Sequence, residues 1–226
     1  MKSMVILSGG QDSVTCLYWA LAQKREVVCL TFDYGQRHRR ELECAARIAE
    51  MAAVPQITVD LGALFAGTSP LTDLSRDVEQ YQDADSLPGG LEKTFVPGRN
   101  LLFLAVAANR AYVEKCQTLV IGVSQEDFGG YPDCREEFLN SMERSIETAL
   151  DRKIQIEAPL LFKDKKKTVE LAAELPGCWE ALAHSHTCYE GKFPPCGHCH
   201  SCLLRARGFE QTGKSDPLLE RQVHAG

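Results

Sequence analysis

The stretch Ser8-Gly9-Gly10-Gln11-Asp12-Ser13 decides the fold that we predict for this chain of 226 residues. It follows an apolar run at 4–7 that is typical of a buried strand. It precedes apolar residues spaced i, i+3, i+4 and i+7 from Val14, which indicate a helix. The first N–H groups of a helix lack internal partners and lie at the positive end of its dipole. Because glycines let an anion approach that backbone, this unit predicts a phosphate-binding loop.

The sequence of the loop indicates which kind of phosphate-binding loop it is. The common phosphate loop requires a Gly-Lys-Ser/Thr ending, which is absent here. Ser-Gly-Gly-x-Asp-Ser instead resembles the pyrophosphate loop of N-type ATP pyrophosphatases, which implies attack at the α-phosphate of ATP and release of pyrophosphate. A glycine turn after a strand can also be purely structural, and Asp12 can also be a helix N-cap. Both serines, the aspartate and the position near the chain start favour the binding function.

Composition restricts the class of protein. The length fits one domain, or one domain with an appendage, and 25% charged with 44% hydrophobic residues is ordinary for a globular protein. Without an apolar run of about 20 residues or a signal segment, we expect a cytoplasmic protein that does not bind membranes. The ten cysteines are then expected to be thiols or metal ligands. The net charge of −6 argues against broad nucleic-acid binding.

Strand-like and helix-like segments alternate along most of the chain. The predicted strands lie at 4–7, 27–32, 56–59, 118–123 and 154–157, and the predicted helices lie near 13–23, 38–53, 100–115, 135–150 and 166–175. This alternation predicts an α/β fold with a mostly parallel sheet covered on both faces, forming a nucleotide-binding domain over 1–175. The helix near 100–115 opens with apolar residues nearly all round, so we expect it to be buried.

Two segments break the alternation. Residues 61–98 have turn signals and little periodicity, and a connection of that length is usually functional or mobile. Residues 176–208 are rich in Cys, His, Gly and Pro and look too irregular to form a core element. We therefore predict that residues 176–226 form a small zinc-binding appendage packed on the same domain.

Four cysteines in this appendage have metal-ligand spacing: Cys188, Cys196, Cys199 and Cys202. Gaps of two residues let successive thiolates reach one metal, and four thiolates complete a closed tetrahedral zinc site of the structural kind. An iron–sulfur cluster is the main alternative, because it also uses cysteine thiolates. His198 and His200 lie between the cysteines, and we expect both to be exposed loop histidines rather than ligands.

Polar residues follow the predicted strands, where ligands bind in open α/β sheets. Asp33 and Tyr34 follow the second strand and are placed to meet a nucleotide, although Asp33 can also cap a turn. Arg99 opens the apolar helix and can pair bidentately with a phosphate or a carboxylate. The fourth strand is followed by Gly122 and then by carboxylates for Mg²⁺ or for substrate donors, at Glu126, Asp127 and Asp133. The lysines at 163–167 are expected to be mostly solvated.

These residues together resemble one family, the 7-cyano-7-deazaguanine synthases of the queuosine pathway. The matching segments span nearly the whole chain: Ser-Gly-Gly-Gln-Asp-Ser (8–13), Thr-Phe-Asp-Tyr-Gly-Gln-Arg-His (31–38), Thr-Phe-Val-Pro-Gly-Arg-Asn (94–100), Gly-Tyr-Pro-Asp-Cys-Arg (130–135), Thr-Cys-Tyr (187–189) and Cys-Gly-His-Cys (196–199). As an ordered set they are highly specific. The spacer from Cys188 to Cys196 is one residue shorter than in some members, which affects a loop and not the number of ligands.

The resemblance implies a Rossmann-like sheet of the adenine nucleotide alpha hydrolase type, with bound Zn²⁺, and with ATP and Mg²⁺ in the reaction. The implied reaction converts 7-carboxy-7-deazaguanine and ammonia to 7-cyano-7-deazaguanine, through an adenylated carboxylate and an amide. The implied catalytic residues are Asp12, Ser13, Arg99, Asp133 and Lys165. The implied ATP-binding residues are Leu7, Ser8, Gly9, Gly10, Gln11, Asp12, Ser13, Asp33, Tyr34 and Gly122. The partners are small molecules, and a homodimer is one candidate for the oligomeric state.

Two other functions remain open. A tRNA-thiolating enzyme of the same superfamily would need a persulfide-bearing cysteine and an RNA-binding face, and the acidic balance counts against it. A non-catalytic zinc module that only senses ATP would not need several polar clusters at strand ends. Cys134 is the one scattered cysteine among polar residues. We expect no covalent role for it, because ammonia can attack an acyl-adenylate directly.

Overall fold

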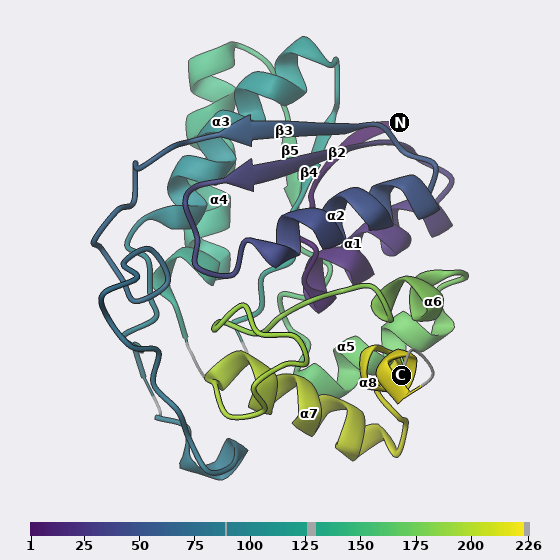
Figure 1. The fold of residues 1–226 in the computed structure, drawn as a ribbon. Helices are drawn as coiled ribbons and strands as arrows, with labels where there is room; N and C mark the ends of the chain where they lie inside the picture. The colour runs from purple at the N-terminus through teal and green to yellow at the C-terminus, as the bar shows by residue number, and fades with distance from the viewer. Residues whose placement is uncertain (89, 126–129, 224–226) are drawn as a thin grey trace.

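A computed structural model describes residues 1–88, 90–125 and 130–223 (Figure 1). Its centre is a five-stranded sheet of β1 (Lys2–Ile6), β2 (Glu26–Asp33), β3 (Gln56–Asp60), β4 (Thr118–Val120) and β5 (Gln155–Glu157). The strand order is β3-β2-β1-β4-β5, and every neighbouring pair is parallel. The predicted parallel α/β fold is confirmed. The predicted strand at 118–123 is shorter than expected, because regular pairing ends at Val120.

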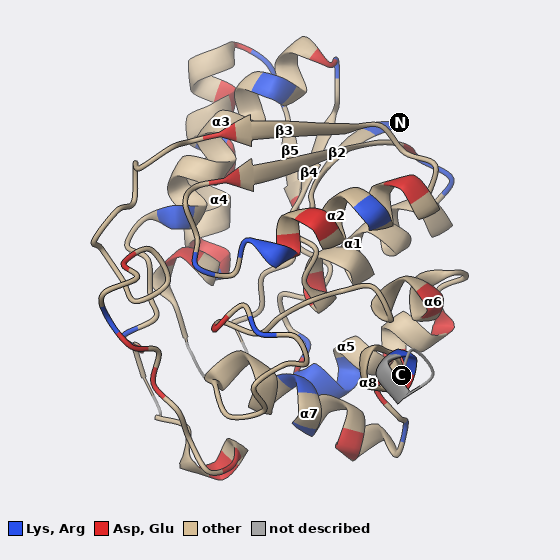
Figure 2. Cartoon of the chain, in the orientation of Figure 1, with Lys and Arg blue, Asp and Glu red and all other residues tan. Residues whose placement is uncertain are grey.

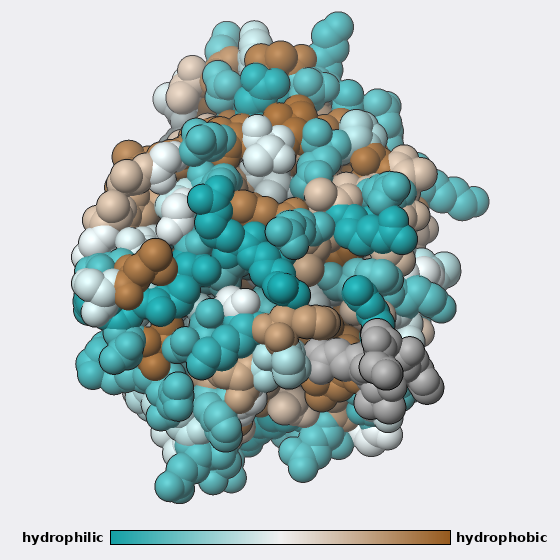
Figure 3. Space-filling model, viewed as in Figure 1, coloured by the Kyte–Doolittle hydropathy of each residue, from teal (hydrophilic) through white to brown (hydrophobic). Residues whose placement is uncertain are grey.

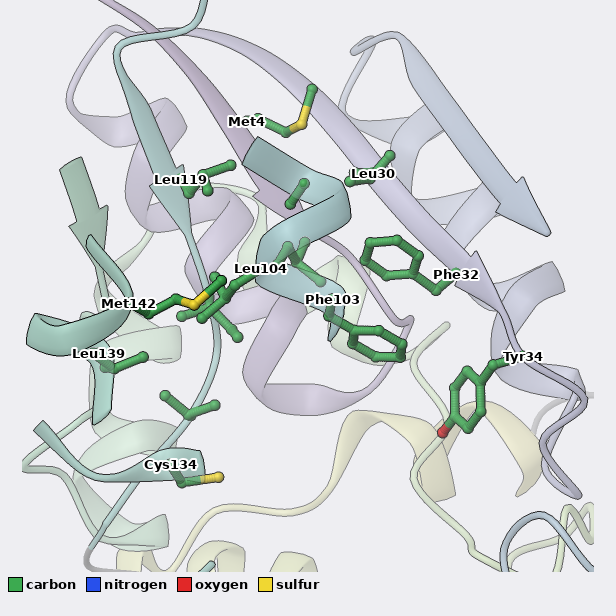
Figure 4. Close-up of a cluster of buried hydrophobic side chains, with 14 of the residues drawn as sticks. Met4, Leu30, Phe32, Tyr34, Phe103, Leu104, Leu119, Cys134, Leu139 and Met142 are labelled. Atoms are coloured by element: carbon green, nitrogen blue, oxygen red, sulfur yellow. The ribbon is translucent and has the colours of Figure 1, made fainter. Parts of the chain in front are cut away.

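Helices cover both faces of the sheet, as Figure 1 shows. They are α1 (Gln11–Ala22), α2 (Arg40–Met51), α3 (Arg99–Val113), α4 (Glu136–Leu150) and α5 (Lys165–Glu174). Alternate residues of a strand point to opposite faces. Met4 and Ile6 accordingly enter a core with α3 and α4, whereas Val5 and Leu7 enter a second core with α1, α2 and α5. The first core contains a stack of Phe32 on Phe103 with ring centroids 4.3 Å apart (Figure 4).

The apolar helix α3 is only partly buried. Phe103 and Leu104 pack under the sheet, as predicted. On its outer side, however, Leu101 is 47% exposed and Val113 is 57% exposed, so the expectation of a helix buried all round is wrong. The reason is that the sheet covers one face of α3, and α4 covers only part of the remainder.

The long connection 61–98 leaves the sheet after β3 and runs down to the C-terminal part of the chain (Figure 1). Its described part contains the short helix η1 (Ala84–Ser86), which Asp83 caps through a capping box. Gln80 bridges to Cys199, and the Tyr81 N–H donates to the His198 carbonyl at 2.9 Å. The connection therefore docks on the cysteine-rich segment, although the two lie far apart in the sequence.

The C-terminal part of the chain is more regular than expected. It forms α6 (Cys178–Leu182), α7 (His200–Thr212) and α8 (Pro217–Val223), together with the loops that carry the cysteines. The expectation that residues 176–208 lack a core element is therefore wrong. Cys178, Leu182 and Phe209 share the second core with α1 and α5, and α7 packs along α5.

The face of the molecule drawn in Figure 3 is predominantly polar. On the face drawn in Figure 3, apolar side chains are small patches between hydrophilic ones. Within the described residues, no helix combines the length and the apolar character needed to cross a lipid bilayer.

Candidate active site

The predicted phosphate loop lies between β1 and α1, as the sequence indicates. Gly10 is the N-cap of α1 and provides no side-chain cap, so the first amides of the helix stay available to a ligand. Asp12 lies in the first turn and is not the N-cap. The Ser13 hydroxyl accepts from the Ser8 N–H at 3.2 Å and donates to the Gly10 carbonyl at 3.0 Å, which holds the loop closed.

Two glycines let neighbouring segments approach this loop. Gly9 has φ +91°, and a Cβ at that position would lie 2.2 Å from the Glu41 carbonyl oxygen of α2. A Cβ at Gly122, after β4, would lie 3.0 Å from the Ser13 nitrogen. At both positions a side chain would push its neighbour away from the loop. A Cβ at Gly10 would meet its nearest atom at an ordinary 3.4 Å, so Gly10 serves access rather than packing.

Asp12 and Lys165 form an ion pair across 153 residues of sequence. Lys165 Nζ lies 2.6 Å from Asp12 Oδ2, while Asp12 Oδ1 is buried and has no hydrogen-bond partner in the described part of the chain. Lys165 is the first residue of α5, which is capped by Asp164. Figure 2 shows the basic residues of α5. Lys166 and Lys167 are exposed, as predicted, so Lys165 alone of these three reaches the loop.

One cavity of about 250 Å³ opens in front of this loop. It is lined by the predicted residues Leu7, Ser8, Gly10, Gln11, Asp12, Ser13, Tyr34, Arg99, Gly122 and Lys165. Arg99 Nη1 lies 3.4 Å from the Tyr34 hydroxyl, and within the described residues no carboxylate lies within 4.0 Å of that guanidinium. Burial raises the pKa of Tyr34 to about 12, with Arg99 opposing the rise. In Figure 4 the Tyr34 hydroxyl points away from Phe32.

Three predicted site residues lie outside the cavity lining: Gly9, which packs against α2, and the two aspartates Asp33 and Asp133. Asp33 faces Arg39 at 2.5 Å and accepts from the Gly35 N–H at 3.2 Å, as a turn-capping aspartate does. Asp133 is buried in η2 (Pro132–Cys134) and accepts from the Asn100 N–H at 3.0 Å. That bond fixes the start of α3, which carries Arg99. Glu126 and Asp127, expected to supply carboxylates for Mg²⁺, lie outside the described residues.

The cavity is also lined by residues that were not predicted from the sequence as site residues. Its described lining includes His38, Glu41, Cys134, His186, Tyr189 and His200. His38 and Tyr189 belong to quoted motifs, so a signal for them existed. Several of these side chains have buried polar atoms without a hydrogen-bond partner, such as the Nδ1 atoms of His38 and His186. Because buried polar groups are normally paired, this concentration of unpaired atoms indicates a ligand site.

The four predicted metal ligands come together. The Sγ atoms of Cys188, Cys196, Cys199 and Cys202 all lie within 4.8 Å of one another. Hydrogen bonds from the Cys199 and Cys202 thiols hold the pKa of Cys188 well below its usual value. The Cys199 N–H points to Cys196 Sγ at 3.3 Å, and such bonds favour thiolates. All ten cysteines lie in the described residues and none of them forms a disulfide, as expected.

The two histidines of this segment differ from each other. His198 is exposed, as expected. His200 is 4% exposed, with Nε2 2.9 Å from Glu92 Oε1, so the expectation of an exposed loop histidine is wrong for it. It begins α7 and lies against the docked 61–98 connection, which local sequence does not reveal.

The fold and loop define the class of protein: a Rossmann-like α/β protein in which a glycine-rich loop joins the first strand of a parallel sheet to the first helix. A solved 4-thiouridine synthetase–RNA complex with bound ATP shares the fold with a TM-score of 0.51 at 20% identity, covering 98% of this chain and 52% of that one.

The family follows from comparison with known sequences. The model of queuosine biosynthesis protein QueC matches residues 2–213. The 7-cyano-7-deazaguanine synthase of Chromobacterium violaceum is 50% identical over 224 residues, covering 97% of this chain and 94% of that protein. The synthase of Laribacter hongkongensis is 47% identical over 220 residues, with the same coverage. This chain belongs to the QueC family of queuosine biosynthesis proteins.

Proposed function

We propose that this protein converts 7-carboxy-7-deazaguanine, ammonia and ATP to 7-cyano-7-deazaguanine. The observation that carries the proposal is the single cavity that joins the phosphate loop to an arginine with no carboxylate partner among the described residues, Arg99. A pyrophosphate-releasing loop and a carboxylate-binding cation at one site fit the activation of a carboxylic acid by ATP. The names of the similar proteins from C. violaceum and L. hongkongensis support this choice of substrate.

The chain's residues divide between the two substrates. The free amides at the start of α1, with Ser8 and Ser13, bind the phosphates. Lys165 neutralises charge that develops on the departing pyrophosphate, and it is placed for this by Asp12. Arg99 binds the substrate carboxylate. The unpartnered Asp12 Oδ1 fits Mg²⁺, which would accompany ATP and supply charge neutralisation.

The chemistry needs two activations at this site. A carboxylate is a poor electrophile, so its oxygen first attacks the α-phosphorus of ATP and pyrophosphate leaves. Ammonia then attacks the acyl carbon, AMP leaves, and an amide results. The amide oxygen attacks the α-phosphorus of a second ATP and a second pyrophosphate leaves. Loss of the two N–H protons and of AMP, which takes the former amide oxygen with it, then gives the nitrile. One cavity serves both activations, because the second ATP occupies the place of the first.

We propose other roles for three of the assigned residues. Asp133 is proposed as a positioning residue for α3, because its carboxylate is committed to the Asn100 N–H. Asp33 is proposed to shape the turn after β2 rather than to touch ATP, because it is paired with Arg39. Gly9 acts by letting α2 approach the loop.

We also propose zinc in the cysteine cluster. Four sulfur atoms within 4.8 Å of one another fit a closed tetrahedral shell, in which no position is left for substrate. Residues 1–175 would then be the nucleotide-binding domain, and residues 176–226 a zinc-organised appendage that shares its core. A cytoplasmic location and a homodimer complete the proposal. Small molecules are the expected substrates, without nucleic acid or membrane.

The proposal is tested with purified protein, ATP and 7-carboxy-7-deazaguanine. We expect carboxylate-dependent exchange of labelled pyrophosphate into ATP without ammonium, and formation of the nitrile, detected by mass spectrometry, once ammonium is added. A tRNA-thiolating enzyme would show no carboxylate dependence, and an ATP sensor would show no exchange. Either result would overturn the proposed reaction.

A further inference from the structure

One carboxylate in the cavity has no role in the proposed binding of ATP or of the acid. Glu41 is the second residue of α2 and is 8% exposed, and its side chain lines the cavity. Its backbone oxygen lies against Gly9, so α2 holds this carboxylate directly beside the phosphate loop. His38 lines the same part of the cavity and is 4% exposed.

Glu41 also differs from the other acid in the described cavity lining. Asp12 is paired with Lys165 at 2.6 Å. Glu41 Oε1 instead lies 3.3 Å from His38 Nε2 and 3.5 Å from Gln36 Nε2, and in the parts of the chain that the structure describes no lysine or arginine nitrogen lies within 4.0 Å of it. A buried carboxylate that lacks a fixed cation favours a ligand that brings positive charge or N–H donors.

Its surroundings hold the carboxylate in place. Gln36 accepts from the Tyr34 N–H at 2.9 Å and donates to the Phe32 carbonyl at 3.3 Å, so its amide is fixed by the end of β2. The His38 ring lies 5.8 Å from the Tyr189 ring. Glu41 and Arg99 both act electrostatically on the Tyr34 hydroxyl, where Glu41 raises the pKa and Arg99 lowers it.

The proposed reaction needs a group of this kind. Ammonia in neutral water is almost entirely ammonium, which has no lone pair for attack. The nitrogen must also lose every proton of ammonium before it becomes a nitrile nitrogen. A carboxylate beside the acyl-adenylate attracts the cation and accepts its proton.

We propose that Glu41 binds ammonium in the cavity and accepts the proton that frees ammonia for attack on the acyl-adenylate, with His38 and Gln36 as positioning residues. This deepens the proposed function and rests on it. The proton passes from ammonium to the Glu41 carboxylate. The nitrogen lone pair then forms the bond to the acyl carbon, the bond from that carbon to the AMP oxygen breaks, and AMP leaves with the electron pair. The new C–N group loses one further proton to become the neutral amide.

The test separates amination from adenylation. Glu41→Gln keeps the size of the side chain and one acceptor oxygen but removes the charge. We expect it to retain carboxylate-dependent pyrophosphate exchange without ammonium, which also shows that it is folded. Its rate of amide formation with ammonium should fall about 100-fold or more. Glu43→Gln removes an exposed charge from the same turn of α2 and should aminate like the wild type.

A neutral nucleophile provides the second measurement. Hydroxylamine is uncharged at neutral pH and needs no base to free its lone pair, so Glu41→Gln should form the hydroxamate at the wild-type rate. Wild-type amination in Glu41→Gln would overturn the proposal. Loss of exchange with a raised KM for the acid would instead assign Glu41 to the N–H groups of the purine ring, which also overturns it. Absence of exchange in the wild type would refute the proposed function itself.

Discussion

Replacing Gly9 with alanine should separate the packing role of the loop from its binding role. The added Cβ would lie 2.2 Å from the Glu41 carbonyl oxygen and 2.8 Å from the Ala45 nitrogen, both backbone atoms of α2. The positive φ of +91° costs about 1–3 kcal/mol for a residue with a side chain. Forcing α2 away adds about 1–3 kcal/mol of overpacking. We therefore expect Gly9→Ala to lower the free energy of unfolding by about 2–6 kcal/mol.

The assay is urea unfolding, with ATP binding measured on the same samples. Gly10→Ala is the matched control, because its Cβ would meet its nearest atom at 3.4 Å and its φ is −80°. An alanine N-cap costs about 1 kcal/mol, so this variant should stay close to wild-type stability while ATP binding weakens. Equal stabilities of Gly9→Ala and the wild type, or an equal loss in Gly10→Ala, would refute the close packing of loop and α2.

Three further predictions concern the chemistry and the metal. Asp12→Ala should unfold like the wild type but lose about 100-fold or more in turnover, because Lys165 loses its partner; wild-type turnover at saturating ATP would contradict this. Metal analysis should find one zinc per chain, and iron with sulfide, or active protein without metal, would contradict this. Cys196→Ser should lower the stability of the C-terminal part of the chain before it changes the rate of the reaction. Cys134→Ser should still make the nitrile, and a wild-type thioester seen by intact mass, with this variant stalled at the adenylate, would make Cys134 the nucleophile.

The sheet and the loop were predictable because their signals are local. A buried strand, two glycines and a helical period lie within about 20 residues, and the spacing of the cysteines is equally compact. The pairing of Lys165 with Asp12 was not predicted, since 153 residues separate the two, and the resemblance implied only that each is a catalytic residue. Side-chain direction was not predictable: Asp33 and Asp133 belong to matching motifs, yet both turn toward backbone amides of their own loops or of α3.

Two features that the sequence did not predict, the helix α7 and the position of Glu41, both depend on long-range packing. Cys, His and Gly mask the helical character of α7, which depends on its contacts with α5 and with the connection 61–98. In the sequence, Glu41 has the features of an ordinary acidic residue in the first turn of a helix, where a negative charge interacts favourably with the helix dipole. Only the close approach that Gly9 permits shows that this turn lies beside the phosphate loop.

The cysteine-rich appendage reaches the phosphate loop directly, through the bond from the His186 N–H to the Gly9 carbonyl at 2.9 Å, and also indirectly, through α7. Cys199 caps α7 and Cys202 lies in its first turn, so a metal held by these thiolates fixes the start of that helix. Further along α7, a Cβ at Gly208 would lie 2.9 Å from both the Cβ and the carbonyl oxygen of Lys165. The helix therefore supports the backbone of the lysine that pairs with Asp12. A closed metal shell would offer substrate no position, yet through α7 it would determine where the positive charge beside the phosphates lies.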